Sequence, residues 1–178
     1  VNAMNLIDGL DGLAAGIGLI AVCTLFSFGW VDGHVLLCLS TAAMAGALVG
    51  FLVHNSAPAH IFLGDSGSHL LGYVLAVVGV LSTTKQYTAW ALTLPALALG
   101  VPLLDAILAV VRRVSTGQPT MAPDLGHVHH RLLRRGFTTQ ESVYLLYGIG
   151  LGLAAAAWAI KAESAPAQAL AIASAGVV

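Results

Sequence analysis

Charged side chains are scarce in this chain of 178 residues. Lys, Arg, Asp and Glu make up 8% of it and hydrophobic residues 58%, whereas ordinary soluble domains are roughly one quarter charged. A soluble domain of this size leaves too much surface exposed to hide so many apolar side chains. The composition therefore predicts an integral membrane protein. Because the formal net charge is −1, no positive field indicates a nucleic-acid partner, and we expect none.

Cysteine is also scarce. The two cysteines, Cys23 and Cys38, lie inside apolar runs, where cysteine usually packs as a small apolar side chain. They therefore indicate no redox compartment. Val1, which opens the sequence, is neither an initiator residue nor part of a signal peptide. We expect the sequence to begin inside a longer protein.

Long apolar runs, in contrast, are abundant, and a membrane-spanning helix needs roughly 20 such residues. Helices are expected because lipid offers no water to unpaired backbone groups. We predict an all-α, polytopic transmembrane helical bundle with about five full spans and a partial sixth. The expected spans are residues 12–31, 35–53, 69–84, 88–111 and 143–160, with residues 165–178 as the partial one. Pro95 and Pro102 are expected to kink the fourth span.

Basic residues are concentrated in one stretch, because five of the seven Lys and Arg lie in residues 112–135. Cytoplasmic loops carry an excess of Lys and Arg, so we place residues 112–142 in the cytoplasm, as a loop within a single domain over residues 1–178. Counting spans backward places residues 54–68 and the N-terminal Asn/Asp stretch on the same side. The polar segments therefore converge on the cytoplasmic face. The isolated charges expected on the opposite side are Asp32, Lys85 and Lys161.

The first polar segment, NAMNLIDGLDGLAAG, repeats an Asn or Asp every third residue. If it is helical, Asn5, Asp8 and Asp11 share a sector of one face. Gly9 and Gly12 beside the aspartates permit close backbone approach or a break in the helix. Two interpretations stay open: Asp-Gly turns that cap the first span, or a functional acidic site at the membrane edge.

The second segment, FLGDSGSHLLG, places Asp65 in a Gly/Ser turn where a helix is expected to begin. Such a turn offers N–H groups and hydroxyls to an anion, and a carboxylate there suits Mg²⁺. The alternative is a helix N-cap at Asp65 or Ser66, which we favour for Ser66. GDSG also occurs around the nucleophile of chymotrypsin-like proteases. We reject that match because those enzymes need a soluble double β-barrel.

The third segment, PDLGHVHHRLL, concentrates imidazoles. His127, His130 and Arg131 would share one side of a helix that starts here. A Zn²⁺ site is one alternative, but the ligand spacing is dense and no cysteine accompanies it. A basic membrane-surface patch is another, although it leaves the histidines unexplained. Imidazole and guanidinium together suit recognition of a diphosphate.

In this order and separation, the three motifs resemble those of the polyprenyl-phosphate N-acetylhexosamine-1-phosphate transferases, of the glycosyltransferase family 4 type. The resemblance covers residue 2 to about residue 136. It is closest to the branch that uses undecaprenyl phosphate and UDP-GlcNAc, with the UDP-MurNAc-pentapeptide branch as the alternative. It implies transfer of a sugar-1-phosphate from a UDP-N-acetylhexosamine to undecaprenyl phosphate, with release of UMP. Such enzymes initiate lipid-linked cell-envelope glycans, including teichoic acid and lipopolysaccharide O-antigen.

The resemblance also implies the cofactor, the location and the roles of residues. It implies Mg²⁺, with Mn²⁺ as an alternative, in a multi-pass protein of the bacterial plasma membrane whose active site faces the cytoplasm. Asp65 matches the metal-binding aspartate, and the catalytic set would be Asp65, Asp8, Asp11 and His127. The residues expected to bind the nucleotide, sugar and phosphates are Asn5, Asp8, Asp11, Arg113, His127, His129, His130 and Arg131.

One departure from the family pattern bears on whether this chain is active by itself. The family carries an adjacent Asp-Asp pair in an earlier loop, and this sequence has no such pair. We therefore expect a C-terminal fragment that lacks the N-terminal helices and is inactive by itself. Two questions stay open: whether the protein forms a homodimer, and whether the chain is instead a segment of an anion transporter. Asp105 is the one charge well inside an expected span, where we expect it to anchor its helix or a nearby arginine, so the support for transport is thin.

Overall fold

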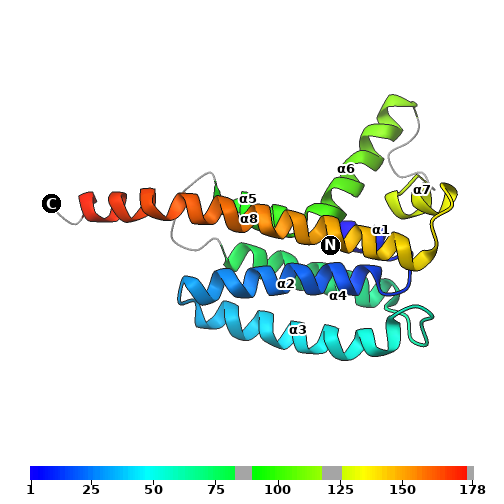
Figure 1. Cartoon of the computed structure of the whole chain (residues 1–178), viewed down its shortest axis with the longest axis horizontal. Coiled ribbons are helices and arrows are strands. Elements are labelled where there is room, and N and C mark those ends of the chain that lie inside the picture. Colours follow the sequence, from blue (N-terminus) through cyan, green and yellow to red (C-terminus); the bar gives the residue numbers. More distant parts are fainter. Residues whose placement is uncertain (83–89, 118–125, 176–178) are drawn as a thin grey trace.

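A computed structural model describes residues 1–82, 90–117 and 126–175 of the chain. The regular structure within these ranges is entirely helical, which confirms the predicted all-α class. The helices are α1 (Asn2–Ile7), α2 (Leu13–Val31), α3 (Val35–Asn55), α4 (Gly64–Leu81), α5 (Trp90–Ala98), α6 (Gly100–Ser115), α7 (Val128–Arg134) and α8 (Thr139–Ala175). In Figure 1, α2, α3 and α4 form one bundle with α8 packed against α2.

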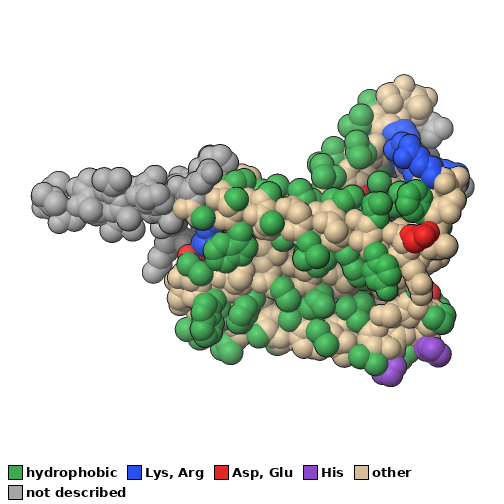
Figure 2. Space-filling model, in the orientation of Figure 1, with side chains coloured by type: hydrophobic (Ala, Val, Ile, Leu, Met, Phe, Trp, Pro, Cys, Tyr) green, Lys and Arg blue, Asp and Glu red, His purple; other side chains and the backbone are tan. Residues whose placement is uncertain are grey.

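Among the described residues, four helices are long and apolar enough to cross a membrane: α2, α3, α4 and the Thr139–Ala162 part of α8. They confirm the prediction of a polytopic membrane protein. α2 is the most enclosed of the four. Of its most apolar 18-residue stretch 61% is buried, whereas only 17% of the corresponding stretch of α3 is buried. The apolar side chains that cover the flank of the bundle in Figure 2 therefore suit contact with lipid.

The predicted fourth span, residues 88–111, is two helices over its described part. α5 ends at Ala98 and α6 begins at Gly100, so the helix is interrupted at Leu99. Pro102 explains the interruption, because it has no N–H to donate to the carbonyl of Ala98 four residues earlier. The interruption at Leu99 confirms the kink expected at Pro102, whereas Pro95 lies inside α5, and a single continuous span is not confirmed. α6 leaves the bundle at a steep angle in Figure 1.

The last two predicted spans form one helix over their described part. α8 runs unbroken from Thr139 to Ala175, so residues 165–175 continue it, and the separate partial span expected there is wrong. The residues between the expected spans are Lys, Ala, Glu and Ser at 161–164, three of them polar. Three of these four are strong helix formers, and none is Gly or Pro, so the change in polarity does not end the helix.

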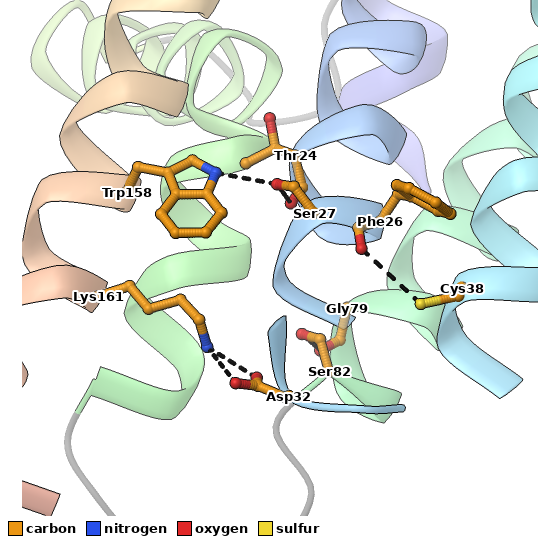
Figure 3. A network of polar contacts seen from close by, with 9 residues as sticks. All are labelled: Thr24, Phe26, Ser27, Asp32, Cys38, Gly79, Ser82, Trp158 and Lys161. Atoms are coloured by element: carbon orange, nitrogen blue, oxygen red, sulfur yellow. Dashed lines mark hydrogen bonds and ion pairs between the residues drawn. The ribbon is translucent and has the colours of Figure 1, made fainter. Parts of the chain in front are cut away.

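One end of the bundle is closed by polar contacts between α2 and α8 (Figure 3). The Lys161 ammonium lies 2.8 and 2.7 Å from the two carboxylate oxygens of Asp32. The indole Nε1–H of Trp158 donates to the hydroxyl of Ser27 at 2.9 Å. Asp32 and Lys161 therefore lie at the same end, as predicted, whereas Lys85 falls outside the described residues.

The opposite end carries α1, α7 and the connection between α3 and α4 (Figure 1). α1 has only six residues, too few for an isolated helix to be stable. Ile7 and Leu13 are completely buried in the main apolar cluster, together with Leu75 of α4 and Leu146 of α8. Apolar packing therefore fixes α1 against α2, α4 and α6.

Candidate functional site

Asn5 joins the first polar segment to the second. Its amide Nδ2 donates to the Oδ1 atom of Asp65 at 2.9 Å and lies 3.0 Å from the hydroxyl of Ser68. Asp65 and Ser68 both stand in the first turns of α4, whose N-cap is Leu63 without a side-chain cap. The expected N-cap at Asp65 or Ser66 is therefore wrong. The carboxylate of Asp65 is exposed and contacts α1 instead.

Asp8 follows directly after α1 and lies within electrostatic range of Asp65. Partial burial, and in second place the negative charge of Asp65, raises the pKa of the Asp8 carboxyl above its usual range. Two carboxylates held this close repel each other and attract a cation. The structure thus brings Asn5, Asp8 and Asp65 together, as the sequence predicted.

Asp11 departs from the predicted pattern. α1 ends at Ile7 and α2 begins only at Leu13, so Asp11 does not share a helix face with Asn5 and Asp8. Its carboxylate instead accepts the backbone N–H of Ala59 at 3.0 Å, in the connection between α3 and α4. Sequence reasoning placed Asp11 with the nucleotide ligands, whereas the structure gives it an anchoring contact.

Two residues that were not predicted from the sequence, Asn55 and Tyr147, hold the turn between α1 and α2 through hydrogen bonds to Gly12. Gly12 has φ +77°, a left-handed conformation that suits glycine. Its N–H donates to the side-chain oxygen of Asn55 at 3.1 Å, and its carbonyl accepts the hydroxyl of Tyr147 at 2.6 Å. Asn55 also donates to the carbonyl of Ile61 at 2.8 Å. The signal in the sequence for this role was an Asn at the end of a long apolar run. Asn55 is buried there, and a buried amide needs hydrogen-bond partners.

His129 brings the third polar segment to the first. A Cβ atom on Gly9 would overlap His129 Nε2, so this imidazole lies directly against the Gly9 backbone. Of the two expectations for the glycines beside the aspartates, close backbone approach is confirmed at Gly9. His129 is only 2% exposed, and its Nδ1 has no hydrogen-bond partner. Burial, and next the neighbouring His130, lowers the pKa of His129 to about 4.

His127 is oriented by the acid inside α6. Its Nδ1 lies 2.8 Å from the Oδ2 atom of Asp105, whose Oδ1 accepts the backbone N–H of Val128 at 2.8 Å. The rings of His127 and His129 are nearly parallel, with centroids 5.9 Å apart. Asp105 therefore anchors the histidine segment, whereas the sequence analysis expected it to anchor its helix or an arginine.

The remaining predicted site residues occupy the edge of this arrangement. The ring of His130 lies 4.2 Å from that of His129, centroid to centroid, and Arg131 is exposed on α7. Arg113 is half-buried near the end of α6. Figure 2 shows basic side chains, which here are arginines, close to α6 and α7. The sequence-predicted residues therefore meet at one end of the bundle, with Asp11 turned to the α3–α4 connection.

The donor set at this end fits Mg²⁺ better than Zn²⁺. Within the described ranges, no group of three or more His, Cys, Asp or Glu side chains is arranged to hold a metal ion by itself. Mg²⁺ typically takes one or two carboxylates and completes its shell with substrate phosphates and water. Asp65 and Asp8 supply two such carboxylates. The dense histidine spacing yields no zinc site in these ranges.

Comparison with known proteins gives one family. Residues 1–83 match the model described as Glycosyl transferase family 4. A probable undecaprenyl-phosphate N-acetylglucosaminyl 1-phosphate transferase of Bacillus subtilis is 42% identical over 149 residues, which are 84% of this chain and 42% of that protein. A decaprenyl-phosphate N-acetylglucosaminephosphotransferase of Mycobacterium tuberculosis is 43% identical over 83% of this chain and 41% of its own length.

A third relative, an undecaprenyl-phosphate alpha-N-acetylglucosaminyl 1-phosphate transferase of Escherichia coli K12, is 30% identical over 82% of this chain and 41% of its own length. The chain thus spans about two fifths of the length of these curated relatives. The names of these relatives agree on the sugar phosphate and differ in the polyprenyl carrier.

Proposed function

We propose, from the premise that this chain belongs to glycosyl transferase family 4, that it forms part of the active site of a polyprenyl-phosphate GlcNAc-1-phosphate transferase. The protein would transfer GlcNAc-1-phosphate from UDP-GlcNAc to undecaprenyl phosphate, release UMP and so initiate a lipid-linked cell-envelope glycan. The relatives' names support GlcNAc more strongly than any one carrier, because they include undecaprenyl and decaprenyl phosphate.

The observation that carries this proposal is the meeting of three polar segments far apart in the sequence. Asn5 contacts Asp65, and Gly9 contacts His129, within one end of an apolar bundle. A carboxylate pair beside an imidazole cluster suits a diphosphate whose charge is balanced from two sides. Phosphoryl transfer depends mainly on such positioning and charge balance.

Asp65 and Asp8 would hold Mg²⁺ at this site. When bound, the cation would balance the negative charge of the sugar-nucleotide diphosphate. Asn5 orients Asp65 through its 2.9 Å hydrogen bond, which leaves the other carboxylate oxygen for a ligand. His127, His130, Arg131 and Arg113 would donate hydrogen bonds to phosphate oxygens as charge moves toward the departing UMP.

We place this end at the cytoplasmic face of the bacterial plasma membrane. This end carries the arginines of α6 and α7, and cytoplasmic loops of membrane proteins are enriched in basic residues. The lipid phosphate would reach the carboxylates from the side of the bundle, with its isoprenoid chain left in the bilayer.

The decisive experiment is a transfer assay on the complete protein in vesicles that contain undecaprenyl phosphate. UDP-GlcNAc and UDP-MurNAc-pentapeptide are supplied in parallel reactions, with decaprenyl phosphate as a second acceptor. We expect UMP release and lipid-linked GlcNAc-phosphate from UDP-GlcNAc, and loss of both on chelation of Mg²⁺. Turnover of only the MurNAc substrate, or of neither, would reject the proposal.

A further inference from the structure

Asp105 is an acid in an apolar helix, and no role in the reaction follows from the motifs. It is 5% exposed and lies midway along α6. A buried carboxylate is costly unless hydrogen bonds satisfy it, and both of its oxygens accept one at 2.8 Å. Both donors belong to the start of the histidine segment. The acid therefore fixes α6 to His127 and Val128.

The two hydrogen bonds differ in what they permit. The backbone N–H of Val128 can only donate, so it always requires an acceptor. The imidazole of His127 has two nitrogens, and a carboxylate accepts a hydrogen bond from Nδ1 only when Nδ1 carries the proton. In the neutral ring this leaves Nε2, on the far side of the ring, as an acceptor. In the charged ring it leaves Nε2–H as a donor.

The orientation of the ring is restrained from a second side. The His127 ring stacks within 5° of parallel on His129, which in turn lies against Gly9 beside Asp8. Asp105 and His129 together hold the His127 plane relative to the carboxylate pair. A carboxylate that orients a working histidine through Nδ1–H is a recurrent arrangement in active sites.

We propose that Asp105 is a positioning residue, which holds His127 with Nδ1–H toward α6 and presents Nε2 to the diphosphate of the donor sugar, to which the charged ring donates Nε2–H. The inference rests on the proposed function, because it assigns His127 a substrate contact. Asp105 itself contacts no substrate. It acts through His127, and its removal should therefore matter only while His127 is present.

The substitution Asp105→Asn gives a sharp test, because the Val128 N–H dictates how the amide must lie. The amide oxygen has to remain on Val128, so the NH₂ group faces His127 Nδ1. Nδ1 must then become an acceptor, and the proton moves to Nε2. The variant keeps the volume and the backbone contact and reverses the tautomer of His127.

The first readout is ¹⁵N NMR of histidine-labelled complete protein, at a pH where the imidazoles are neutral. The His127 signal is identified by its absence in His127→Gln. We expect the Nδ1–H tautomer in the unsubstituted protein and the Nε2–H tautomer in Asp105→Asn. An Nε2–H tautomer in the unsubstituted protein, or no reversal in the variant, overturns the proposal whatever the activity is.

The second readout is turnover with UDP-GlcNAc. We expect Asp105→Asn to lower kcat by roughly 10- to 100-fold, with a smaller change in KM, and to add no loss to His127→Gln. Additive losses in the double variant would show that Asp105 acts elsewhere. The control Asp32→Asn removes an acid of the opposite end and should retain turnover. Absence of transfer in the unsubstituted protein rejects the proposed function, while the tautomer measurement still decides the arrangement of Asp105 and His127.

Discussion

Asp65 combines a fixed position with an exposed carboxylate. Asn5 holds one of its oxygens, and the charge faces the site shared with Asp8. In Asp65→Asn the side-chain oxygen can still accept the hydrogen bond from Asn5, but the negative charge is lost. We expect kcat of the complete protein to fall by at least about 100-fold in an assay with Mg²⁺, because one electrostatic group contributes about that factor.

The matched control for this experiment is Asp32→Asn, which removes the same charge from the end that carries Lys161. Unchanged kcat in the control and the expected loss in Asp65→Asn would support the metal role. Near-normal Mg²⁺-dependent turnover by Asp65→Asn would remove Asp65 from that role.

His129 provides a pH-dependent prediction at the same scale. Its pKa of about 4 in the folded protein lies below the usual value of 6.5, so the unfolded chain takes up a proton first as the pH falls. The contribution of His129 to the free energy of unfolding is therefore complete above pH 6.5 and declines between pH 6.5 and 4. We expect the thermal midpoint to fall more steeply over this window in the unsubstituted protein than in His129→Gln. Equal slopes would contradict the lowered pKa.

At the scale of elements, the turn between α1 and α2 depends on residues from two distant helices. Asn55→Ala leaves the Gly12 N–H and the Ile61 carbonyl without their partner. Each such buried group costs about 1–3 kcal/mol of unfolding free energy. We expect a lower thermal midpoint in detergent and weaker turnover, because the turn carries Asp8.

Ser40→Ala serves as the control in the same helix, since the Ser40 hydroxyl bonds only to the carbonyl of Leu36 in its own helix. Its midpoint should stay close to that of the unsubstituted protein. Equal losses in Asn55→Ala and Ser40→Ala would contradict the anchoring role of Asn55.

The sequence predicted the elements well where one property dominates. Apolar length identified α2, α3 and α4, and Pro102 marked the interruption between α5 and α6. It failed where polarity and helix propensity disagree, as at residues 161–164, three of which are polar although the stretch continues α8. It also failed at Asp11, because spacing alone cannot distinguish one helix of twelve residues from a short helix followed by a turn.

At the scale of the molecule, the parity of the spans was sufficient to bring the polar segments to one end. The particular contacts were not predictable. Asn5 and Asp65 are 60 residues apart, and nothing in either motif states that they touch. As a charge inside an apolar span, Asp105 indicated a buried partner. That this partner is His127 and not an arginine depends on the direction in which α6 leaves the bundle, which the sequence does not give.

The orientation across the membrane gives a whole-molecule prediction. His60, in the connection between α3 and α4, and Val35, after the turn at Asp32, are both exposed and lie at opposite ends of α3. In a background without Cys23 and Cys38, we expect Val35→Cys to react with a membrane-impermeant maleimide in intact cells. We expect His60→Cys to react only after lysis. The reverse pattern would place the site outside the cytoplasm.

The two residues that hold Gly12, Asn55 and Tyr147, come from α3 and α8, which are both long and apolar enough to cross a membrane. A change in bilayer thickness is met by helix tilt, and unequal tilt of α3 and α8 would pull the Gly12 amide and carbonyl in different directions. The position of Asp8, which this turn carries, would then depend on the lipids around the bundle. We expect turnover in vesicles to pass through an optimum as acyl-chain length increases, and this dependence to flatten in Tyr147→Phe.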